Sequence, residues 1–404
     1  MGRLHPLKIL LVTHNFPRHV HDMAGAFLLA LARGQQALGH EVRVLAPHAP
    51  GLPLEERVDG VDVVRYRYGP EAEETLAYAG TMHEQALRSW RARWRLLRFI
   101  AASRAGLRRE LRAWHPDLLH VHWWVPGGFA VWPGVARRVP VVLTSHGTDV
   151  FLLDRFPLAR PMARAIFRAA RQVTVISSPL VPRVEALGVP RDRITVLPMP
   201  LTAERFGKGF AGSRDPARLL FVGRLVERKG AEYALRALAA LREAGRGVRL
   251  TVCGEGPERS RLEALARELG VADVSEFTGA LPHDAVAELY RTSAVLVMPA
   301  VTDWKGEQEG FGMVLVEAMA SGLPVVATLS GGIADVIRDG RTGLLVSERD
   351  PGALADAIGR LLDDPRMAES LASAAAADLE ARFAPESIAR AFADVYRRAI
   401  GDAA

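Results

Sequence analysis

Residues 309–317 read EGFGMVLVE, which sets two carboxylates, Glu309 and Glu317, eight positions apart. The apolar run that contains this stretch continues to Ala320 and stops at the residues SGLP, 321–324. Glycine followed by proline is a typical helix stop, so the pattern predicts a short helix from Met313 to Ala320. The first carboxylate then lies in a glycine-containing loop before the helix, and the second lies inside the helix.

The loop and the start of this helix are suited to a bound anion. Gly310 and Gly312 let the backbone approach a ligand closely, and the helix offers unpaired N–H groups and a positive dipole end. Glu309 is expected at the mouth of this cradle and Glu317 about two turns into the helix, near the same face. Carboxylates accept hydroxyl hydrogen bonds in pairs, which suits the diols of a sugar or ribose. The alternative, a buried helix with a solvated glutamate at each end, is less favoured because a Gly-x-Gly loop contributes little to packing.

Length and composition indicate a globular protein of several domains. The chain has 404 residues, too many for one ordinary core, so two or three domains are expected. The single cysteine, Cys253, excludes an internal disulfide and a cysteine-rich metal site, and fits a reducing compartment. The first apolar run, 9–12, is too short for the core of a secretory signal, and no uncharged run approaches a membrane span. We therefore expect a cytoplasmic protein.

Charge is divided unevenly along the chain. Residues 1–200 contain 27 basic and 16 acidic side chains, whereas residues 201–404 contain 25 and 30. This asymmetry predicts two domains with different partners, the first facing an anionic one. The most basic segment, 86–114, has tryptophans and leucines at helical spacing opposite a row of arginines. Such a helix either lies peripherally on the inner face of an anionic membrane or packs in the core with its arginines solvated. Nucleic-acid binding is disfavoured because no recognition motif accompanies the charge.

Alternating strand and helix patterns predict two successive α/β series. The first has expected strands at 7–13, 41–46, 118–122, 141–144, 173–177 and 194–197, with a helix at 26–38. The second follows a linker at 198–216 and has strands at 218–222, 248–253, 276–279, 294–299 and 324–328, with closing helices at 372–382 and 387–400. No Gly-x-Gly-x-x-Gly follows the first strand, which disfavours a dinucleotide-binding domain.

Several residues that follow these strands are candidates for ligand contact. Trp123 and Trp124 are suited either to stacking on a sugar ring or to plain packing. Gly25 either receives a phosphate or sugar at a helix start or is a turn glycine. In the second series, Arg224 and Lys229 are suited to neutralising a diphosphate, unless they are solvated loop charges. His146, which precedes a glycine at a strand end, favours a ligand contact over a place in the core.

In these motifs the chain resembles the family 4 retaining glycosyltransferases. The motifs run in family order over nearly the whole chain: the Gly25 loop, SHG at 145–147, GRL at 223–225 with KG at 229–230, GEGP at 254–257, the E-x7-E pair at 309 and 317, and SGLPV at 321–325. The resemblance implies the GT-B fold, in which two Rossmann-like, doubly wound parallel-sheet domains face each other across a cleft. The implied parts are an acceptor-binding domain at 1–203, a nucleotide-sugar-binding domain at 204–384, and a helix at 385–404 that packs back on the first domain.

The resemblance also implies the substrates and the site. The donor is expected to be a nucleotide-diphosphate sugar, UDP- or GDP-linked, and the acceptor a hydroxyl of a glycan, a lipid-linked sugar or a small molecule. No metal or other cofactor is expected, and the sequence contains no Asp-x-Asp. Catalytic roles are implied for Glu309, Arg224, Lys229 and His146. Donor contacts are implied for Gly25, Gly223, Glu255, Gly310, Phe311, Gly312, Met313 and Glu317, and acceptor contacts are expected for Trp123, Trp124 and Asp149.

Two other functions fit the same fold. A sugar-nucleotide epimerase would need acid and base groups at the sugar but no acceptor pocket. A non-catalytic glycan- or lipid-binding relative would have lost the site, and the presence of Arg224, Lys229, Glu309 and Glu317 argues against it.

Overall fold

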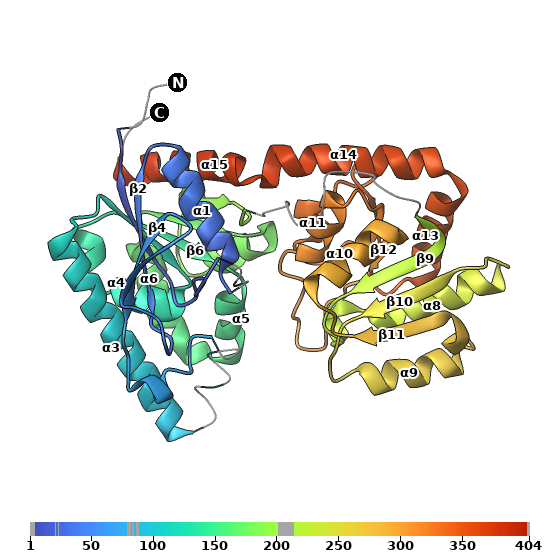
Figure 1. The fold of residues 1–404 in the computed structure, drawn as a ribbon, viewed down its shortest axis with the longest axis horizontal. Helices are drawn as coiled ribbons and strands as arrows, with labels where there is room; N and C mark the ends of the chain where they lie inside the picture. The colour runs from blue at the N-terminus through green and yellow to red at the C-terminus, as the bar shows by residue number, and fades with distance from the viewer. Residues whose placement is uncertain are drawn as a thin grey trace. The chain divides into compact units, whose positions relative to one another are not determined.

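The computed structural model describes residues 5–20, 22, 24–78, 82, 85, 89–200 and 214–401. The chain divides into two compact units, Met1–Leu201 with Pro385–Ala404, and Thr202–Ala384, called unit 1 and unit 2 below. Each unit is built on its own twisted sheet with helices packed against it (Figure 1). The predicted fold class, two doubly wound α/β domains, is confirmed by this architecture. The predicted linker at 198–216 falls outside the described residues from 201 to 213.

The sheet of unit 1 has the strand order β3-β4-β2-β1-β5-β6-β7-β8. Its strands are β1 Lys8–Val12, β2 Glu41–Pro47, β3 Glu55–Val58, β4 Val61–Tyr66, β5 Leu118–His122, β6 Val141–Ser145, β7 Gln172–Val175 and β8 Ile194–Val196. Its α-helices are α1 Ala26–Ala37, α3 Trp90–Ala113, α4 Phe129–Val131, α5 Thr148–Arg155, α6 Arg160–Ala169, α7 Val181–Glu185 and α15 Pro385–Ile400.

Alternation along β1 explains why helices cover both faces of this sheet. Leu10 and Val12 belong to a core that includes α3, α5 and α6, whereas Ile9 and Leu11 belong to a core that includes α1 and α15. Successive strand residues point to opposite faces, so an unbroken apolar run is buried on both sides. The central strand is therefore apolar from Ile9 to Val12, as the sequence of the first expected strand indicates.

A hairpin at one edge of the sheet is missing from the predicted strands. Strands β3 and β4 pair antiparallel, whereas the other strand pairs of the described part of unit 1 are parallel. The two strands are joined by Asp59 and Gly60, which both have positive φ, 49° and 82°. Aspartate followed by glycine is the typical signal for such a two-residue turn. The hairpin was not predicted because β3, with the sequence EERV, is mostly charged and does not have the apolar pattern of a typical strand. Charged residues are one means by which an exposed edge strand avoids pairing with another chain.

The sheet of unit 2 has the strand order β11-β10-β9-β12-β13-β14. Its strands are β9 Asp215–Val222, β10 Arg249–Cys253, β11 Ser275–Gly279, β12 Ser293–Met298, β13 Val325–Thr328 and β14 Leu344–Val346, the last of which was not predicted. Its α-helices are α8 Ala231–Glu243, α9 Arg259–Glu268, α10 His283–Thr292, α11 Met313–Ala320, α12 Ile333–Val336, α13 Pro351–Asp363 and α14 Pro365–Phe383. The predicted short helix from Met313 to Ala320 is confirmed as α11.

Both sheets reverse their strand order at one point, which positions the candidate sites. In unit 2 the reversal lies between β9 and β12, and in unit 1 it lies between β1 and β5. Loops that leave the carboxyl ends of two such strands diverge in opposite directions, and ligands of doubly wound sheets bind in the crevice between them. Candidate sites are therefore expected at the residues that follow β9 and β12, and at those that follow β1 and β5.

Helix α3 covers residues 90–113 of the predicted basic helix, and residues 86–88 of that prediction lie outside the described part. Its buried residues are Phe99, Ser103, Leu107 and Glu110, of which Leu107 belongs to the predicted apolar face. Trp90, Trp94 and Leu97 are exposed by 66%, 60% and 56%. The predicted apolar face is therefore confirmed only in its C-terminal part, where Leu107 is buried and Leu111 and Trp114 pack against the core, and its N-terminal part is exposed.

Candidate functional site

The loops at the reversal point of unit 2 are held together by glycines. A Cβ on Gly230 would lie 1.8 Å from the carbonyl oxygen of Pro299, which follows β12. A Cβ on Gly254, after β10, would lie 1.9 Å from the carbonyl oxygen of Gly223, after β9. Both distances are far inside van der Waals contact, so only glycine allows these backbones to meet. The GRL, KG and GEGP motifs thus place three loop backbones against one another.

Lys229 and Glu309 form an ion pair at this point, with Nζ and Oε2 2.5 Å apart and both side chains largely buried. The other carboxylate oxygen of Glu309 accepts a hydrogen bond of 3.2 Å from the backbone N–H of Gly312. Gly312 has φ 83° and begins α11, so Glu309 lies at the N-terminus of the helix. The residue thus joins the loop after β9 to the start of α11.

Glu317 lies within α11, and its Oε2 accepts a hydrogen bond of 2.8 Å from the hydroxyl of Tyr290 on α10. Burial raises the pKa of the Glu317 carboxyl, and the hydrogen bond from Tyr290 opposes that rise. A carboxylate that is mostly buried and has one oxygen engaged retains acceptor capacity on the other oxygen. Tyr290 was not predicted, since its position on α10 carries only a helical apolar pattern.

The other residues predicted in unit 2 divide into two groups. Arg224 is exposed, and its side chain makes no hydrogen bond or ion pair with the residues that the structure describes. Met313 is 42% exposed at the start of α11. By contrast, the Glu255 carboxylate is paired with Arg259, and the Phe311 ring packs edge-on against Phe383 with centroids 5.8 Å apart. Phe311 is therefore a packing residue through its side chain and offers a ligand only its backbone.

Aromatic rings gather at the reversal point of unit 1. The rings of His14, which follows β1, and Trp123, which follows β5, have centroids 4.3 Å apart. Trp123 also stacks on His146, which follows β6, with centroids 3.9 Å apart. Nδ1 of His122 and Nε2 of His146 are 3.1 Å apart, so one ring donates to the other. Trp123 has φ 61°, a left-handed conformation that is rare for a bulky residue. Such strain is concentrated at functional sites.

The imidazoles of this cluster are neutral at physiological pH. Burial lowers the pKa of His14 to about 4, and burial followed by the neighbouring imidazoles lowers the pKa of His122 and His146 well below the usual value. A neutral imidazole offers one donor and one acceptor. Because one nitrogen of His146 faces His122, its Nδ1 is the atom left for a ligand. His14 and His122 were not among the predicted residues, although both stand directly after or at the end of a strand.

Two of the predicted acceptor contacts need correction. Trp124 is 4% exposed and donates its indole N–H to the carbonyl oxygen of Asp149 at 2.6 Å. Asp149 is 2% exposed, and its carboxylate accepts from the Ser145 hydroxyl at 2.8 Å and from the backbone N–H groups of Trp124 and His146 at 3.2 Å. Both residues are committed to holding the loops after β5 and β6, so direct contact with an acceptor does not fit them. Trp123 remains a candidate.

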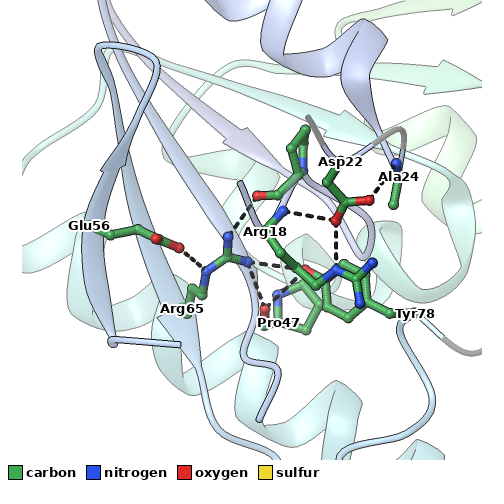
Figure 2. A network of polar contacts seen from close by, with 8 residues as sticks. Arg18, Asp22, Ala24, Pro47, Glu56, Arg65 and Tyr78 are labelled. Atoms are coloured by element: carbon green, nitrogen blue, oxygen red, sulfur yellow. Dashed lines mark hydrogen bonds and ion pairs between the residues drawn. The ribbon is translucent and has the colours of Figure 1, made fainter. Parts of the chain in front are cut away.

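The loop that leads from β1 to Gly25 is anchored by two charged residues (Figure 2). Asp22 accepts from the backbone N–H and the Nε of Arg18, at 3.1 and 2.6 Å, and from the backbone N–H of Ala24 at 3.1 Å. Arg65, on β4 and 1% exposed, donates to the carbonyl oxygen of Pro17 at 2.8 Å. Gly25 has φ 77°, and a Cβ there would lie 2.7 Å from the Asn15 carbonyl oxygen. Glycine is thus required at this position by close packing of the loop, whether or not it also contacts a ligand.

The described residues include neither a membrane-spanning helix nor a metal-binding cluster. No helix among them is both long and apolar enough to cross a bilayer. No group of three or more histidine, cysteine, aspartate or glutamate side chains in the described ranges is arranged to hold a metal ion.

Comparisons with known proteins agree with the geometry. The family model described as glycosyl transferases group 1 matches residues 206–378, and the glycosyl transferase 4-like domain matches residues 24–200. The chain is 31% identical over 412 residues to glycogen synthase of Mycobacterium tuberculosis, covering 96% of this chain and 94% of that protein. It is 31% identical over 411 residues to D-inositol 3-phosphate glycosyltransferase of Frankia alni, covering 94% and 95%.

Solved structures match over nearly the full length. Sucrose-phosphate synthase from Thermosynechococcus elongatus superposes with a TM-score of 0.74 at 24% identity, covering 98% of this chain and 100% of that one. Anabaena HepE in complex with UDP-glucose superposes with a TM-score of 0.66 at 19% identity, covering 96% and 99%. At these identities the likeness concerns the fold, which is of the GT-B type.

Proposed function

Because this chain belongs to the family 4-like glycosyltransferases, we propose that it moves a hexosyl unit from a UDP- or GDP-sugar to a hydroxyl acceptor with retention of configuration. Relatives named as glycogen synthase and D-inositol 3-phosphate glycosyltransferase support sugar transfer to a hydroxyl. The HepE complex with UDP-glucose supports a nucleotide sugar as donor for this fold. The acceptor class remains a glycan, a lipid-linked sugar or a small molecule.

The observation that carries the proposal is the group of charges at the reversal point of unit 2. Lys229, held by Glu309 at 2.5 Å, and the exposed Arg224 stand in the loop after β9, beside the N-terminus of α11. A diphosphate at this point would meet two cations and a helix dipole, each of which stabilises the negative charge that develops as the sugar leaves. Glu317, with a free acceptor oxygen, is suited to a ribose hydroxyl of the same nucleotide.

The proposed reaction balances without a metal. The bond between the anomeric carbon and the diphosphate oxygen breaks, and its electrons leave with the diphosphate. The acceptor oxygen attacks the same face of the sugar, and its proton passes to the departing phosphate oxygen. Arg224 and Lys229 stabilise the diphosphate, and Glu309 supports the oxocarbenium-like carbon by its charge and by keeping Lys229 in place. His146 and Trp123 of unit 1 are proposed to contact the sugar and the acceptor.

A donor-binding test addresses the nucleotide. UDP-, GDP- and ADP-sugars would be compared by the rise they cause in melting temperature, on wild type, Glu317→Ala and Arg224→Ala. We expect a rise with one base that is lost in both variants. The matched control is Arg267→Ala, because Arg267 on α9 is also exposed and unpaired among the described residues. If no nucleotide sugar raises the wild-type melting temperature at millimolar concentration, the donor assignment is wrong and the binding-protein alternative is favoured.

A transfer test addresses the chemistry. The donor found above would be incubated with a panel of acceptors, and the anomeric configuration of any product read by NMR coupling constants. Product with the configuration of the donor supports retention, and inverted product contradicts it. Conversion of the donor to its epimer without an acceptor would instead favour the epimerase alternative.

We also propose that α3 binds the surface of an anionic membrane. Trp90, Trp94 and Leu97 are exposed and lie on one helical face at positions i, i+4 and i+7. Arginines 91, 93 and 95 lie among them. Exposed tryptophans beside arginines are suited to the interface of a bilayer with acidic lipids.

Sedimentation with vesicles tests this surface. Wild-type protein is expected to sediment with phosphatidylglycerol vesicles at low salt and to be released at high salt. Trp90→Ser/Trp94→Ser should abolish binding, whereas Trp304→Ser, which removes a 78% exposed tryptophan from unit 2, should not. Equal loss in both variants, or no sedimentation of wild type, would reject the membrane surface.

A further inference from the structure

Five arginines line an open pocket of about 810 Å³ in unit 1, which we call the arginine pocket: Arg137, Arg168, Arg171, Arg193 and Arg398. Its floor lies at the N-terminal ends of neighbouring strands, since Pro140 precedes β6, Gln172 begins β7 and Arg193 precedes β8. His146 follows the opposite, carboxyl end of β6. The arginine pocket is therefore separated from the candidate site of unit 1 by the length of the sheet.

Two of the guanidinium groups are fixed by hydrogen bonds to neutral groups. Arg193 donates from Nε to the carbonyl oxygen of Arg171 at 3.0 Å and from Nη2 to that of Arg168 at 3.2 Å. Arg398, in the last turn of α15, donates to the Thr195 hydroxyl at 3.0 Å. These bonds hold the pocket without neutralising it, because carbonyl and hydroxyl oxygens carry no net charge.

No carboxylate forms an ion pair with any of the five arginines among the described residues, although many other arginines of the chain are paired, as Arg246 is with Asp363 at 2.7 Å. Burial lowers the pKa of Arg193; the charge of Asp192 opposes this, and the nearby Arg171 and Arg168 lower it further. Gln172 is 8% exposed, and its Oε1 has no hydrogen-bond partner in the described part of the chain. The pocket thus carries positive charge that no ion pair among the described residues compensates.

Helix ends account for only part of this charge. Helices α6 and α15 both end at the pocket, and a helix C-terminus carries roughly half a negative charge. Two ends thus supply about one negative charge, and Asp192 beside Arg193 supplies a second, against five guanidinium groups. Arg193 donates hydrogen bonds to carbonyl oxygens at the end of α6, and Arg398 donates to Thr195 on β8. The side chains of Arg137, Arg168 and Arg171 have no such partner among the described residues. The remaining positive charge is available to a ligand.

We propose that the arginine pocket binds a soluble anion that carries two or more phosphate groups. Guanidinium groups bind phosphate oxygens through paired N–H donors, and the net charge of the pocket exceeds what a single phosphate would neutralise. The volume of about 810 Å³ is that of a site for a small molecule, which fits a ligand that enters the pocket more than a flat lipid surface. The proposal is independent of the transferase reaction, because it concerns the other end of the sheet.

Calorimetric titration of the full-length protein with tripolyphosphate, in buffer of physiological ionic strength, tests the proposal. We expect saturable binding of tripolyphosphate, weaker binding of pyrophosphate and the weakest binding of inorganic phosphate. Arg168→Gln/Arg171→Gln should weaken tripolyphosphate binding about ten-fold or more. The matched control is Arg108→Gln/Arg112→Gln, which removes two exposed arginines of the separate arginine cluster of α3 that are unpaired among the described residues. This control should bind as wild type does.

Three results would overturn the proposal. One is the absence of tripolyphosphate binding to wild type, and another is an equal loss in both double variants, which would indicate diffuse attraction to a basic surface. The third is a loss of phosphatidylglycerol-vesicle binding in Arg168→Gln/Arg171→Gln without any binding of tripolyphosphate, which would indicate a lipid surface.

A labelling experiment on wild type covers the case in which the double variant fails to fold. Phenylglyoxal modifies accessible arginines, and the modified positions are identified by mass spectrometry. Tripolyphosphate should protect Arg168, Arg171 and Arg398 and leave Arg108 and Arg112 reactive. Protection spread equally over both clusters, or none at all, would contradict the proposal.

Discussion

Glu309 connects three parts of unit 2 through three acceptor atoms. Its carboxylate oxygens accept from Lys229 at 2.5 Å and from the Gly312 backbone at 3.2 Å, and its carbonyl oxygen accepts from the Gly332 backbone at 2.9 Å. The ammonium group of Lys229 is thereby oriented before any ligand arrives. Orientation in advance is what makes a fixed charge effective at a transition state, because little reorganisation is then needed during the reaction.

We expect Lys229→Met to lower kcat of the proposed transfer by about 10²- to 10³-fold, because one preorganised cation at the leaving group is lost. KM for the donor should rise less than kcat falls, since the charge on the diphosphate grows as the bond breaks. Steady-state kinetics with the donor identified by thermal shift provide the measurement. A change confined to KM would show that Lys229 binds the ground state and the transition state equally.

A pH-dependent prediction follows from Asp22. Burial favours the neutral acid, but hydrogen bonds from Arg18 and Ala24 outweigh it and lower the pKa of Asp22 to about 2. Its contribution to stability is therefore present above the unfolded pKa, near 4, and is lost as pH falls toward 2. Asp22→Asn should lower the free energy of unfolding by about 1–2 kcal/mol at pH 7 and by less at pH 3. Urea unfolding at both pH values checks this, and a difference that grew on acidification would contradict it.

Among elements, α15 contributes most to unit 1 from far along the chain. Gly34 of α1 packs so closely on it that an added Cβ would lie 2.8 Å from the Cβ of Ala389. Gln35 donates to the Ala389 carbonyl oxygen at 2.8 Å. Beneath the helix, the Tyr396 hydroxyl is 2.8 Å from Nδ1 of His120 on β5, and Nε2 of His120 is 2.7 Å from the Thr144 hydroxyl. A buried chain of hydrogen bonds therefore connects α15 to the centre of the sheet.

Tyr396→Phe should destabilise unit 1 by about 1–3 kcal/mol, because it leaves a nitrogen of the buried His120 without a partner. Tyr233→Phe is the matched control, since the Tyr233 hydroxyl on α8 bonds only to the exposed Arg349 at 3.2 Å among the described residues. Chemical unfolding monitored by far-ultraviolet circular dichroism, which reports on both units, provides the measurement. Equal effects of the two substitutions would show that the His120 hydrogen bond is not worth more than a surface contact.

The same scale shows why elements differ in how well a sequence predicts them. Helix α11 is bounded by Gly312 and by the Ser321-Gly322 stop, and these local signals suffice. The hairpin of β3 and β4 had a local turn signal at Asp59 and Gly60, but it was not predicted because the edge strand β3 is mostly charged. The buried face of α3 had no local signal, because which turn meets the core depends on where β2 and β4 lie. The sequence therefore predicts the type and bounds of a single element better than it predicts which residues of that element contact its neighbours.

At the scale of the whole molecule, buried histidines are confined to unit 1. Burial lowers the pKa of His14 to about 4 and that of His120 to about 3, and His122 and His146 shift in the same direction. The unfolded chain takes up these protons below about pH 6.5, whereas the folded unit resists protonation until the pH is much lower. The free energy of unfolding therefore falls as pH decreases from 7 toward 4.

Six of the seven tryptophans lie in unit 1, so their fluorescence reports mainly on this unit. We expect its unfolding free energy to drop by at least about 2 kcal/mol between pH 7 and pH 4.5. In His14→Phe, which keeps an aromatic ring beside Trp123, the drop should be smaller because one proton-accepting group is absent. An unchanged pH dependence in this variant would contradict the assignment of His14 as a buried neutral imidazole.

The candidate site was predictable where motifs are local and not where it depends on assembly. Glu309, Glu317, Lys229 and the glycines could be named because each motif identifies its own loop. Tyr290 and His122 could not be named, since only the folded sheets bring Tyr290 against Glu317 and His122 against His146. Trp124 and Asp149 were misassigned for the same reason, because their positions after strands suggested exposure while the neighbouring loops bury them.

The discontinuous make-up of unit 1 has a consequence for biosynthesis. Because α15 is translated after all of unit 2, a nascent chain that has released its first two hundred residues still lacks Ile388, Phe392 and Tyr396 for one face of the first sheet. The whole sequence of unit 2 is available earlier, so unit 2 can fold as an inserted domain before unit 1 is complete. The domain that is begun first is thus the one completed last.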